Sequence, residues 1–549
     1  MPLITVGNTT RAFPDGTCTG AIFDVLYPNR SPRPLAASLN GRVRPLDWSP
    51  DGDCTLSLLD YTHDEGRRIY ERSLRFLFLL AMRHVLPGTQ VRIEHSVGQG
   101  IYIDVQADLS SEIVAQIEAR MRDLRDAALP FTRERWTRQQ AMDYFTAEGN
   151  LDKVRLLSYR PYAYFDLYGC GGLYEYFYGD MLPSTDHIRT FSLLRHGPGI
   201  VLQMPSPQAP DAVSPFVEHP KMMRAYAEAA HWYNVVGCKN AADLNEMIER
   251  GSMRELVRVS EALQEKSIAD IADRIARQNS RAVFIAGPSS SGKTTFTNRL
   301  AIQLRVNGLR PVMLSLDNYY KNLEDVPLDT DGSPDLECLE ALDTALLGEQ
   351  LTDLFRGQTV KIPRFSFQTN SRKPERQPLR VEADQPILIE GIHGLNPKLA
   401  EAVPRELAYR VYISALTTLN LDDHNRIRTT DVRLLRRLVR DNQFRHVPFG
   451  ETLAMWPSVR RGEERFIFPF QEEADIIFNS ALPYELSVLK KYAYPMLSQI
   501  DECSPHFTAA RRLVKFLNYF QSADVESELG PTAILREFIG GCSFYLKPQ

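Results

Sequence analysis

A glycine-rich turn between an apolar run and a helical pattern constrains this chain more than any other feature. Residues 282–286 are uninterrupted apolar residues, which predicts a buried parallel strand. The next eight residues, Gly287-Pro-Ser-Ser-Ser-Gly-Lys-Thr294, match the pattern G-x-x-x-x-G-K-[S/T] in full. A helix is expected next, with its inner side formed by Phe296, Leu300, Ile302 and Leu304. Strand, glycine loop and helix together are the context in which this pattern binds phosphate groups.

The residue types of this loop suit a nucleotide phosphate. Glycines let backbone N–H groups turn toward phosphate oxygens, and the helix N-terminus adds its positive dipole end. Lys293 is expected to reach the β- and γ-phosphates, and the Thr294 hydroxyl is expected to ligate Mg²⁺. The predicted nucleotide-binding residues are Gly287, Ser289, Ser290, Ser291, Gly292, Lys293, Thr294 and Thr295.

The bulk composition limits the other classes of function. The chain has 549 residues, too many for a single hydrophobic core. With 64 Lys and Arg against 69 Asp and Glu, its net charge of −5 argues against a generally basic nucleic-acid binder. Seven scattered cysteines without a C-x-x-C pair are typical of reduced thiols in a cytoplasmic protein. We find no signal-peptide pattern and no apolar stretch long enough to span a bilayer, so no membrane partner is expected.

Two acidic residues follow predicted strands in the same half. Residues 311–316 are expected to form one strand, followed by Asp317, and residues 386–389 a second, buried strand, followed by Glu390. Ligands of open α/β sheets bind at the carboxyl ends of the strands. Asp317 could accept the proton of an attacking hydroxyl, and Glu390 could hold Mg²⁺ directly or through water.

These features resemble the uridine kinase and phosphoribulokinase family of phosphate-loop kinases across residues 281–500. The resemblance implies an α/β fold with a parallel sheet flanked by helices, and ATP and Mg²⁺ as cofactors. It also implies that Asp317, followed by Tyr319 and Tyr320, is the general base that orients a nucleoside 5′-hydroxyl. The substrate-binding residues that it implies are Tyr320, Asp335 of the Ser-Pro-Asp segment, Phe367 and Arg372.

The acceptor segment 361–373 departs from the family pattern. It keeps a proline, Phe367 and Arg372. It has Phe365, Ser366 and Asn370 where the family usually has Tyr, Asp and His. The identity of the acceptor is therefore left open by the sequence.

A run of arginines between residues 431 and 441 has helical spacing. Such a run is usually a solvated helix face. In this position, however, the sequence is similar to the family's lid motif R-R-x-x-R-D, with Arg436, Arg437, Arg440 and Asp441 at the matching places. The resemblance implies that Arg436 binds nucleotide and that Arg437 and Arg440 take part in catalysis, since guanidinium groups make multidentate contacts with phosphate.

The N-terminal part resembles two domains of threonyl-tRNA synthetases. Residues 1–62 are similar to the TGS domain, a ubiquitin-like fold, through the Pro-Asp-Gly turn at 14–16 and a type I′ hairpin at Asn40-Gly41. Residues 63–219, with a helix from Glu71, are similar to the editing domain. The histidine and cysteine positions of that family are occupied here by Arg72, Phe76, Phe177 and Met181, which argues against hydrolytic editing.

The remaining segments carry no expected chemistry. Residues 220–280 show apolar residues at three- and four-residue spacing and are interpreted as a helical connector. Residues 501–549 are interpreted as a helix and a tail. The aromatic run 159–178 is interpreted as a packed strand region, with a base-stacking surface as the alternative.

Three functions follow from these observations. The first is an ATP-dependent kinase acting on the 5′-hydroxyl of a pyrimidine nucleoside, uridine or cytidine. The second is a sugar or other metabolite kinase of phosphoribulokinase type, motivated by the altered acceptor segment. The third is an ATP-switched, RNA- or tRNA-associated regulator, which the negative charge disfavours. A homo-oligomer is compatible with all three.

Overall fold

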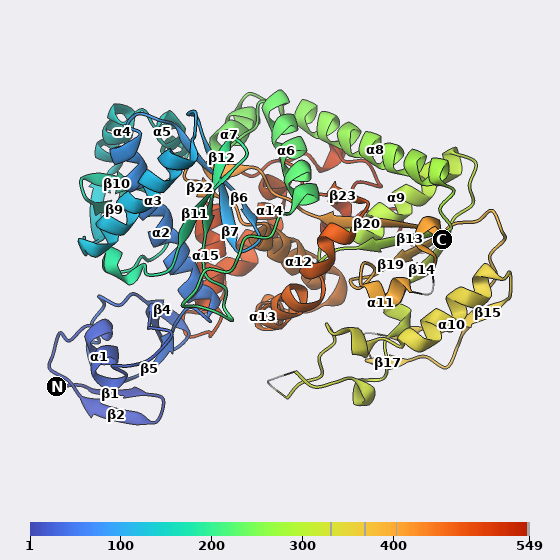
Figure 1. Ribbon diagram of the computed structural model, residues 1–549, viewed down its shortest axis with the longest axis horizontal. Helices are drawn as coiled ribbons and strands as arrows, with labels where there is room; N and C mark the ends of the chain where they lie inside the picture. The colour runs from blue at the N-terminus through green and yellow to red at the C-terminus, as the bar shows by residue number, and fades with distance from the viewer. Residues whose placement is uncertain (330–331, 367–368, 402, 546–549) are drawn as a thin grey trace.

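The computed structural model describes residues 1–329, 332–366, 369–401 and 403–545. In Figure 1 a small N-terminal module lies at the lower left, a mixed α/β region above it, a row of helices along the top, and a parallel sheet at the right. None of the helices within these ranges combines the length and the apolar character that crossing a membrane requires.

The N-terminal module is a five-stranded sheet of order β2-β1-β5-β3-β4, packed on one helix. At the turn between β3 and β4, Asn40 and Gly41 have φ angles of +51° and +75°, as the predicted type I′ turn requires. The sequence analysis does not predict α1, because eight residues span too few turns to show a clear period. The elements are β1 (Leu3–Val6), β2 (Thr9–Ala12), α1 (Thr19–Leu26), β3 (Ala36–Leu39), β4 (Arg42–Arg44) and β5 (Cys54–Leu59).

The second region is built around the buried helix α2 (Asp64–Val85), which begins seven residues before the expected Glu71. Two antiparallel sheets, of order β11-β12-β7-β6 and β10-β9-β8, pack with it. In β7, Ile101, Ile103 and Val105 are buried at every second position, which is the period of a half-buried strand. The other elements are β6 (Val91–Val97), β7 (Gly100–Val105), α3 (Ser111–Asp126), β8 (Thr132–Thr137), α4 (Arg138–Ala147), α5 (Leu151–Ser158), β9 (Tyr164–Cys170), β10 (Leu173–Glu175), β11 (Ser192–His196) and β12 (Gly199–Gln203).

Three helices connect this region to the parallel sheet: α6 (Pro220–Val235), α7 (Ala241–Glu249) and α8 (Met253–Gln278). In α8, Ile268, Ile271 and Ile275 are fully buried at three- and four-residue spacing. Helix α8 runs along α9, and α6 packs against the edge strand β23.

The region of the glycine loop is a five-stranded parallel sheet of order β14-β19-β13-β20-β23, flanked by helices. The predicted α/β fold class is therefore confirmed. The strands of the sheet are β13 (Ala282–Ala286), β14 (Val312–Ser315), β19 (Ile387–Glu390), β20 (Ala408–Ser414) and β23 (Ile476–Asn479). The small hairpins are β15 (Val360–Ile362) with β18 (Gln377–Leu379), β16 (Phe365–Ser366) with β17 (Ser371–Arg372), and β21 (Asn420–Asp422) with β22 (Asn425–Arg426). The helices are α9 (Lys293–Val306), α10 (Thr344–Phe355), α11 (Pro397–Ala400), α12 (Thr429–Arg445), α13 (Phe449–Phe466) and α14 (Glu485–Ser498).

Helix α9 packs on the sheet with the expected side, apart from one residue. Phe296, Leu300 and Leu304 are fully buried. Ile302, also expected on the inner side, is 43% exposed. Two residues correspond to about 200° of helical rotation, so Ile302 lies on the face opposite Leu300 and Leu304.

The C-terminal segment folds back onto the parallel-sheet region. It contains α15 (Phe507–Leu517) and α16 (Arg536–Ile539). Ile534 and Phe538 are fully buried and belong to the same hydrophobic core as Phe296 of α9. The segment expected to be a tail therefore contributes to the core.

Candidate active site

The glycine loop follows β13, the middle strand of the sheet. Gly287 is required by close packing, because a Cβ atom there would lie 2.1 Å from the carbonyl oxygen of Ile413. Gly292 has a φ of +87°, in the region that favours glycine. Ser290 adopts a φ of +59° despite its side chain, and strained residues of this kind cluster in functional loops. The loop wraps around the N-terminal end of α9, where the helix dipole favours an anion.

Two hydroxyl groups of the loop are buried without a partner. Neither Ser290 Oγ nor Ser291 Oγ has a hydrogen-bond partner in the part of the chain that the structure describes. A buried hydroxyl left unpaired costs free energy, so such groups are normally satisfied. Phosphate oxygens are acceptors that would fit these two donors.

Lys293 and Thr294 face the two predicted acids. Lys293 Nζ donates a hydrogen bond to the carbonyl oxygen of Pro288 at 3.2 Å. Burial lowers the pKa of Lys293, and the carboxylates of Glu390 and Asp317 oppose this change. Thr294 Oγ1 donates to Glu390 Oε1 at 3.4 Å.

The strand order explains why these acids lie beside the loop. Strand β19 lies between β14 and β13, and Glu390 pairs with Ser315 on one side and Ile285 on the other. Asp317 follows β14 by two residues, so both acids are at the carboxyl edge next to the loop. Burial raises the pKa of Glu390 to about 7, and the Asp317 carboxylate adds to this rise. The hydroxyl of Thr294 and the carboxylate of Glu390 are oxygen donors of the kind that Mg²⁺ prefers.

The structure corrects the expectation for Arg436. This residue is fully buried. Its Nε donates to Glu485 Oε2 at 2.6 Å, and its Nη2 donates to the carbonyl oxygen of Ser480 at 2.8 Å. Its Nη1 lies 3.4 Å from the carbonyl oxygen of Ser290. Because its donors are used inside the protein, Arg436 braces the loop from behind and does not face a phosphate.

Arg433 and Glu463 brace the loop in the same way. Arg433 Nε donates to the carbonyl oxygen of Ser289 at 2.9 Å, and its Nη1 donates to Glu463 Oε2 at 3.0 Å. Glu463 Oε1 accepts a hydrogen bond from the backbone N–H of Ser289 at 3.2 Å. The sequence analysis assigns no role to either residue, and Glu463 has no motif around it that would have revealed one.

Arg437 and Arg440 lie nearer the open side of the loop. Their side chains are 12% and 14% exposed. Arg437 Nη1 donates to Ser289 Oγ at 3.0 Å. Arg437 Nε and Arg440 Nε donate to Asp441 at 3.2 and 2.9 Å. The structure thus brings Arg437 to the loop, and Asp441 positions both guanidinium groups.

Two of the predicted substrate-binding residues hold backbone around Asp317. Arg372 Nε and Nη2 donate to the carbonyl oxygens of Tyr320 and Tyr319 at 2.8 and 3.1 Å, and Nη2 also lies 3.1 Å from Asp343. Tyr320 is buried, and its hydroxyl donates to the carbonyl oxygen of Leu336 at 3.0 Å. These contacts shape the turn that presents Asp317.

The other two predicted substrate-binding residues have different outcomes. The Asp335 carboxylate accepts a hydrogen bond from the backbone N–H of Glu337 at 3.1 Å, which makes it a turn cap. Phe367 lies outside the described residues. Glu337 itself was not predicted. Burial raises its pKa to about 7, and the carboxylate of Glu463 adds to this rise.

In the synthetase-like region, three of the four positions that hold histidine or cysteine in the editing domains carry apolar side chains. The rings of Phe76 and Phe177 lie 6.1 Å apart, and Met181 is buried in the same core. Arg72 donates to the carbonyl oxygen of Asp180. Phe76 and Phe177 therefore lie side by side, and none of the four positions holds a histidine or cysteine.

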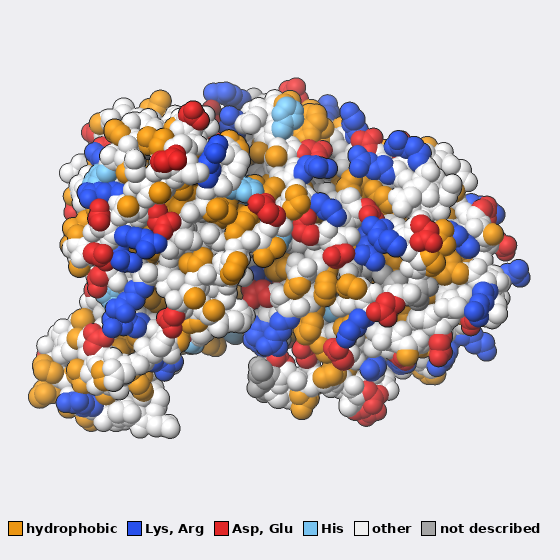
Figure 2. All heavy atoms as spheres, viewed as in Figure 1, with side chains coloured by type: hydrophobic (Ala, Val, Ile, Leu, Met, Phe, Trp, Pro, Cys, Tyr) orange, Lys and Arg blue, Asp and Glu red, His pale blue; other side chains and the backbone are white. Residues whose placement is uncertain are grey.

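Most aromatic residues of the run 159–178 are packed in the structure, as the sequence analysis predicts. Phe165, Tyr168 and Tyr176 are buried, whereas Tyr162 and Tyr164 are 44% and 59% exposed. On the face shown in Figure 2, acidic and basic side chains are interspersed, without a continuous basic surface.

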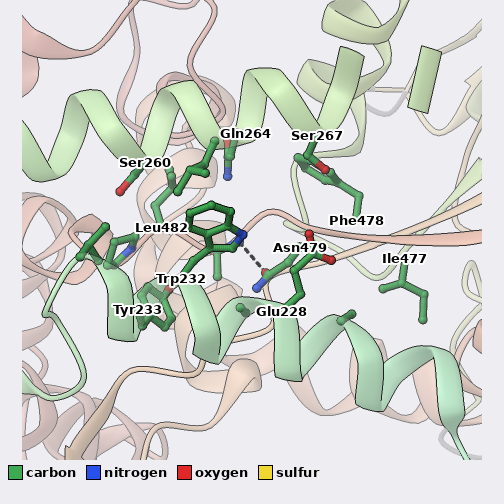
Figure 3. Close-up of a pocket in the computed structure, with 16 residues that line it drawn as sticks. Glu228, Trp232, Tyr233, Ser260, Gln264, Ser267, Ile477, Phe478, Asn479 and Leu482 are labelled. Carbon is green, nitrogen blue, oxygen red and sulfur yellow. Dashed lines mark hydrogen bonds between the residues drawn. The ribbon is translucent and has the colours of Figure 1, made fainter. Parts of the chain in front are cut away.

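A cavity of about 120 Å³ lies at the edge of the sheet, between α6, α8 and β23 (Figure 3). Trp232 and Tyr233 of α6 line it together with Gln264 of α8. The cavity contains none of the predicted site residues, so it is separate from the glycine loop.

Comparisons with known proteins find relatives for two parts of the chain. The family described as "Phosphoribulokinase / Uridine kinase family" matches residues 282–486. A uridine kinase of Halobacterium salinarum is 30% identical over 197 residues, which cover 36% of this chain and 78% of that protein. A solved structure described as a possible uridine kinase from Bacillus stearothermophilus is 18% identical, with a TM-score of 0.25, and covers 38% of this chain and 98% of that one.

The N-terminal part is similar to threonine–tRNA ligases. The ligase of Wolbachia pipientis subsp. Culex pipiens is 27% identical over 183 residues, 33% of this chain and 29% of that protein. The ligase of Carboxydothermus hydrogenoformans is 27% identical over 190 residues, 34% of this chain and 30% of that protein. The chain thus spans less than a third of the length of these two ligases. Through its C-terminal region the chain belongs to the phosphoribulokinase/uridine kinase family of phosphate-loop kinases, joined to an N-terminal part that is homologous to threonine–tRNA ligases.

Proposed function

We propose that this protein is an ATP- and Mg²⁺-dependent kinase that phosphorylates a hydroxyl group of a small molecule, with the 5′-hydroxyl of a pyrimidine nucleoside as the favoured acceptor. The observation that carries the proposal is the meeting of Lys293, Thr294, Asp317 and Glu390 at the carboxyl ends of three adjacent strands. A phosphate-binding lysine, a hydroxyl and two acids are the groups that phosphoryl transfer to an alcohol needs.

In this mechanism the residues act mainly by positioning and by neutralising charge. Asp317 accepts the proton of the acceptor hydroxyl. Lys293 and Arg437 neutralise charge on the transferred phosphoryl group. Thr294 and Glu390 would hold Mg²⁺, which supplies further neutralisation of the phosphate oxygens when bound.

The pyrimidine nucleoside is favoured because the sequence keeps Asp317 followed by aromatic residues and because a uridine kinase is 30% identical over this region. A sugar or other metabolite of phosphoribulokinase type is the second candidate. One observation favours this second candidate. Nε and Nη2 of Arg372 already donate to backbone carbonyl oxygens and contact Asp343, so these two groups are not available to bind the base of a nucleoside.

The test is an ADP-release assay on the full chain with a panel of nucleosides and sugars. Uridine and cytidine are expected to stimulate ADP release. Asp317→Asn is expected to lower kcat by about 10²- to 10⁴-fold, the usual contribution of a general base, without weakening ATP binding. Lys293→Ala is expected to abolish transfer while the fold remains. Stimulation by sugars alone would select the second candidate, and normal turnover by Asp317→Asn would show that another group is the base.

A further inference from the structure

The C-terminal segment places a carboxylate on the phosphate-binding end of α9. Glu537 Oε2 accepts a hydrogen bond from the backbone N–H of Thr295 at 3.2 Å and one from Thr295 Oγ1 at 2.7 Å. The Tyr545 hydroxyl lies 3.5 Å from the same Thr295 Oγ1. Thr295 therefore directs both of its polar donors at residues that lie more than 240 positions later in the chain.

This contact is held by packing on both sides. Ile534 is fully buried against the glycine loop, and a Cβ atom at Gly292 would lie 2.7 Å from its Cγ2 atom. The Phe538 ring lies 5.0 Å from the guanidinium of Arg436, which contacts the other side of the loop. Glu537 lies between these two buried residues in the sequence, so its place at Thr295 is fixed by the core of the protein.

The negative charge of Glu537 lies at the N-terminal end of α9, where the helix dipole favours an anion. No Lys or Arg side chain of the described residues forms an ion pair with Glu537. Its carboxylate adds to those of Asp317 and Glu390 around Lys293. Backbone and hydroxyl donors at a helix N-terminus are the groups that bind phosphate oxygens. A nucleotide and Glu537 thus require the same donors, and their negative charges repel each other.

We propose that Glu537 competes with the nucleotide for Thr295 and thereby sets the affinity of the loop for the phosphate donor. The proposal rests on the proposed function only in that a nucleotide binds at this loop. Binding of the nucleotide then requires the Glu537 carboxylate to leave Thr295, and the free energy of that displacement is subtracted from the affinity.

The test compares two variants that make the same chemical change on the same segment. In Glu537→Gln the amide oxygen keeps the shape and can still accept a hydrogen bond, but the negative charge is gone. In the control, Glu528→Gln, the change is in the ion pair with Arg258 on the side that faces α8.

The affinity of the full chain for ATP is measured by calorimetry for the wild type and both variants. Glu537→Gln is expected to bind ATP on the order of tenfold more tightly, because a neutral amide forms a weaker hydrogen bond with Thr295 than a carboxylate does and does not repel the phosphate groups. Glu528→Gln is expected to match the wild type. Unchanged or weaker binding by Glu537→Gln would overturn the proposal.

A second measurement does not depend on a variant. Hydrogen exchange of residues 534–545 in the wild type is expected to become faster when ATP is added, because the segment loses its contact with Thr295. Slower or unchanged exchange would mean that Glu537 remains in place, and the proposal would be wrong.

Both measurements report nucleotide binding, whereas the acceptor panel reports phosphoryl transfer. A chain that binds ATP as expected here but phosphorylates no acceptor would refute the proposed function alone.

Discussion

Replacing Glu463 with alanine should both destabilise the protein and loosen the glycine loop. Glu463 is fully buried. It accepts hydrogen bonds from Arg433 Nη1 at 3.0 Å, Arg460 Nη1 at 2.9 Å and the backbone N–H of Ser289 at 3.2 Å. Burial alone would raise its pKa, but the attraction of Arg433 and Arg460 outweighs this and holds the pKa below its usual value. Glu463 is therefore ionised at neutral pH, and its removal leaves a buried guanidinium and a loop N–H unpaired.

The magnitude follows from the cost of breaking a buried ion pair, which is about 3–5 kcal/mol. In a domain of 150–250 residues, 1 kcal/mol corresponds to about 2–4 °C in Tm, so the expected fall is roughly 6–20 °C. The matched control is Glu464→Ala. Glu464 also binds Arg460, at 2.9 Å, but its side chain is 39% exposed, and an exposed pair contributes only about 0–1 kcal/mol.

The assay is thermal unfolding of wild type, Glu463→Ala and Glu464→Ala at pH 7, followed by circular dichroism and tryptophan fluorescence. The affinity of each variant for ATP is measured below its transition. Glu463→Ala should lose affinity as well as stability, because Ser289 loses its anchor. A Tm for Glu463→Ala within about 4 °C of that of Glu464→Ala would refute the reasoning, since a surface contact costs no more than that.

Two further predictions concern buried charges between the two halves. Lys153→Met should lower the free energy of unfolding by about 3–5 kcal/mol. Lys153 lies 3.2 Å from Glu175 and 3.7 Å from Asp422, and both buried carboxylates would lose this cation. A urea midpoint equal to that of the surface variant Arg83→Met would contradict this prediction. Burial would raise the pKa of Asp431, but Arg512 and Arg68 outweigh it and hold the pKa at about 2. Because this pKa is lower than the value near 4 in the unfolded chain, ionised Asp431 stabilises the fold at neutral pH by about 2–3 kcal/mol, and this contribution is lost as the pH falls from about 5 to about 1. In Asp431→Asn the free energy of unfolding should therefore fall less steeply over this pH range. Urea midpoints that fall with pH as steeply in Asp431→Asn as in the wild type would refute this.

The sequence predicts those parts of the site that are local in the chain. The glycine loop, its strand and its helix are contiguous, so their pattern is visible in about 30 residues. Asp317 and Glu390 were found because each follows an expected strand and because parallel strands end at one edge. The sequence does not reveal the two acids that contact the loop from elsewhere, because their partners are distant: Glu463 lies 174 residues from Ser289, and Glu537 lies 242 residues from Thr295. No local pattern distinguishes such acids from others on a helix.

Arg436 shows why a correct motif match can still misplace a side chain. Arg433, Arg436 and Arg440 are spaced at three and four residues, so the sequence indicates that they share one helix face. It does not indicate that Arg433 and Arg436 are buried in the protein whereas Arg440 is partly exposed. This burial depends on Glu463 and Glu485, which supply buried carboxylates from α13 and α14. Spacing predicts neighbours along a helix, whereas burial depends on partners elsewhere in the chain.

Helix α12 contacts both the synthetase-like half and the glycine loop. Its first turn carries Asp431, which lies 3.2 Å from Arg68 of α2. Two residues further along the helix, Arg433 donates a hydrogen bond to the carbonyl oxygen of Ser289. The two residues are about 3 Å apart along the helix axis, so α12 contacts α2 and the glycine loop within one helical turn. Hairpin β21/β22, which immediately precedes α12, adds a second connection through Asp422 and Lys153. Helix α12 thus contacts the N-terminal half at Asp431 and the loop at Arg433, whereas the carboxylates that hold Arg433 and Arg436, those of Glu463 and Glu485, belong to the C-terminal region.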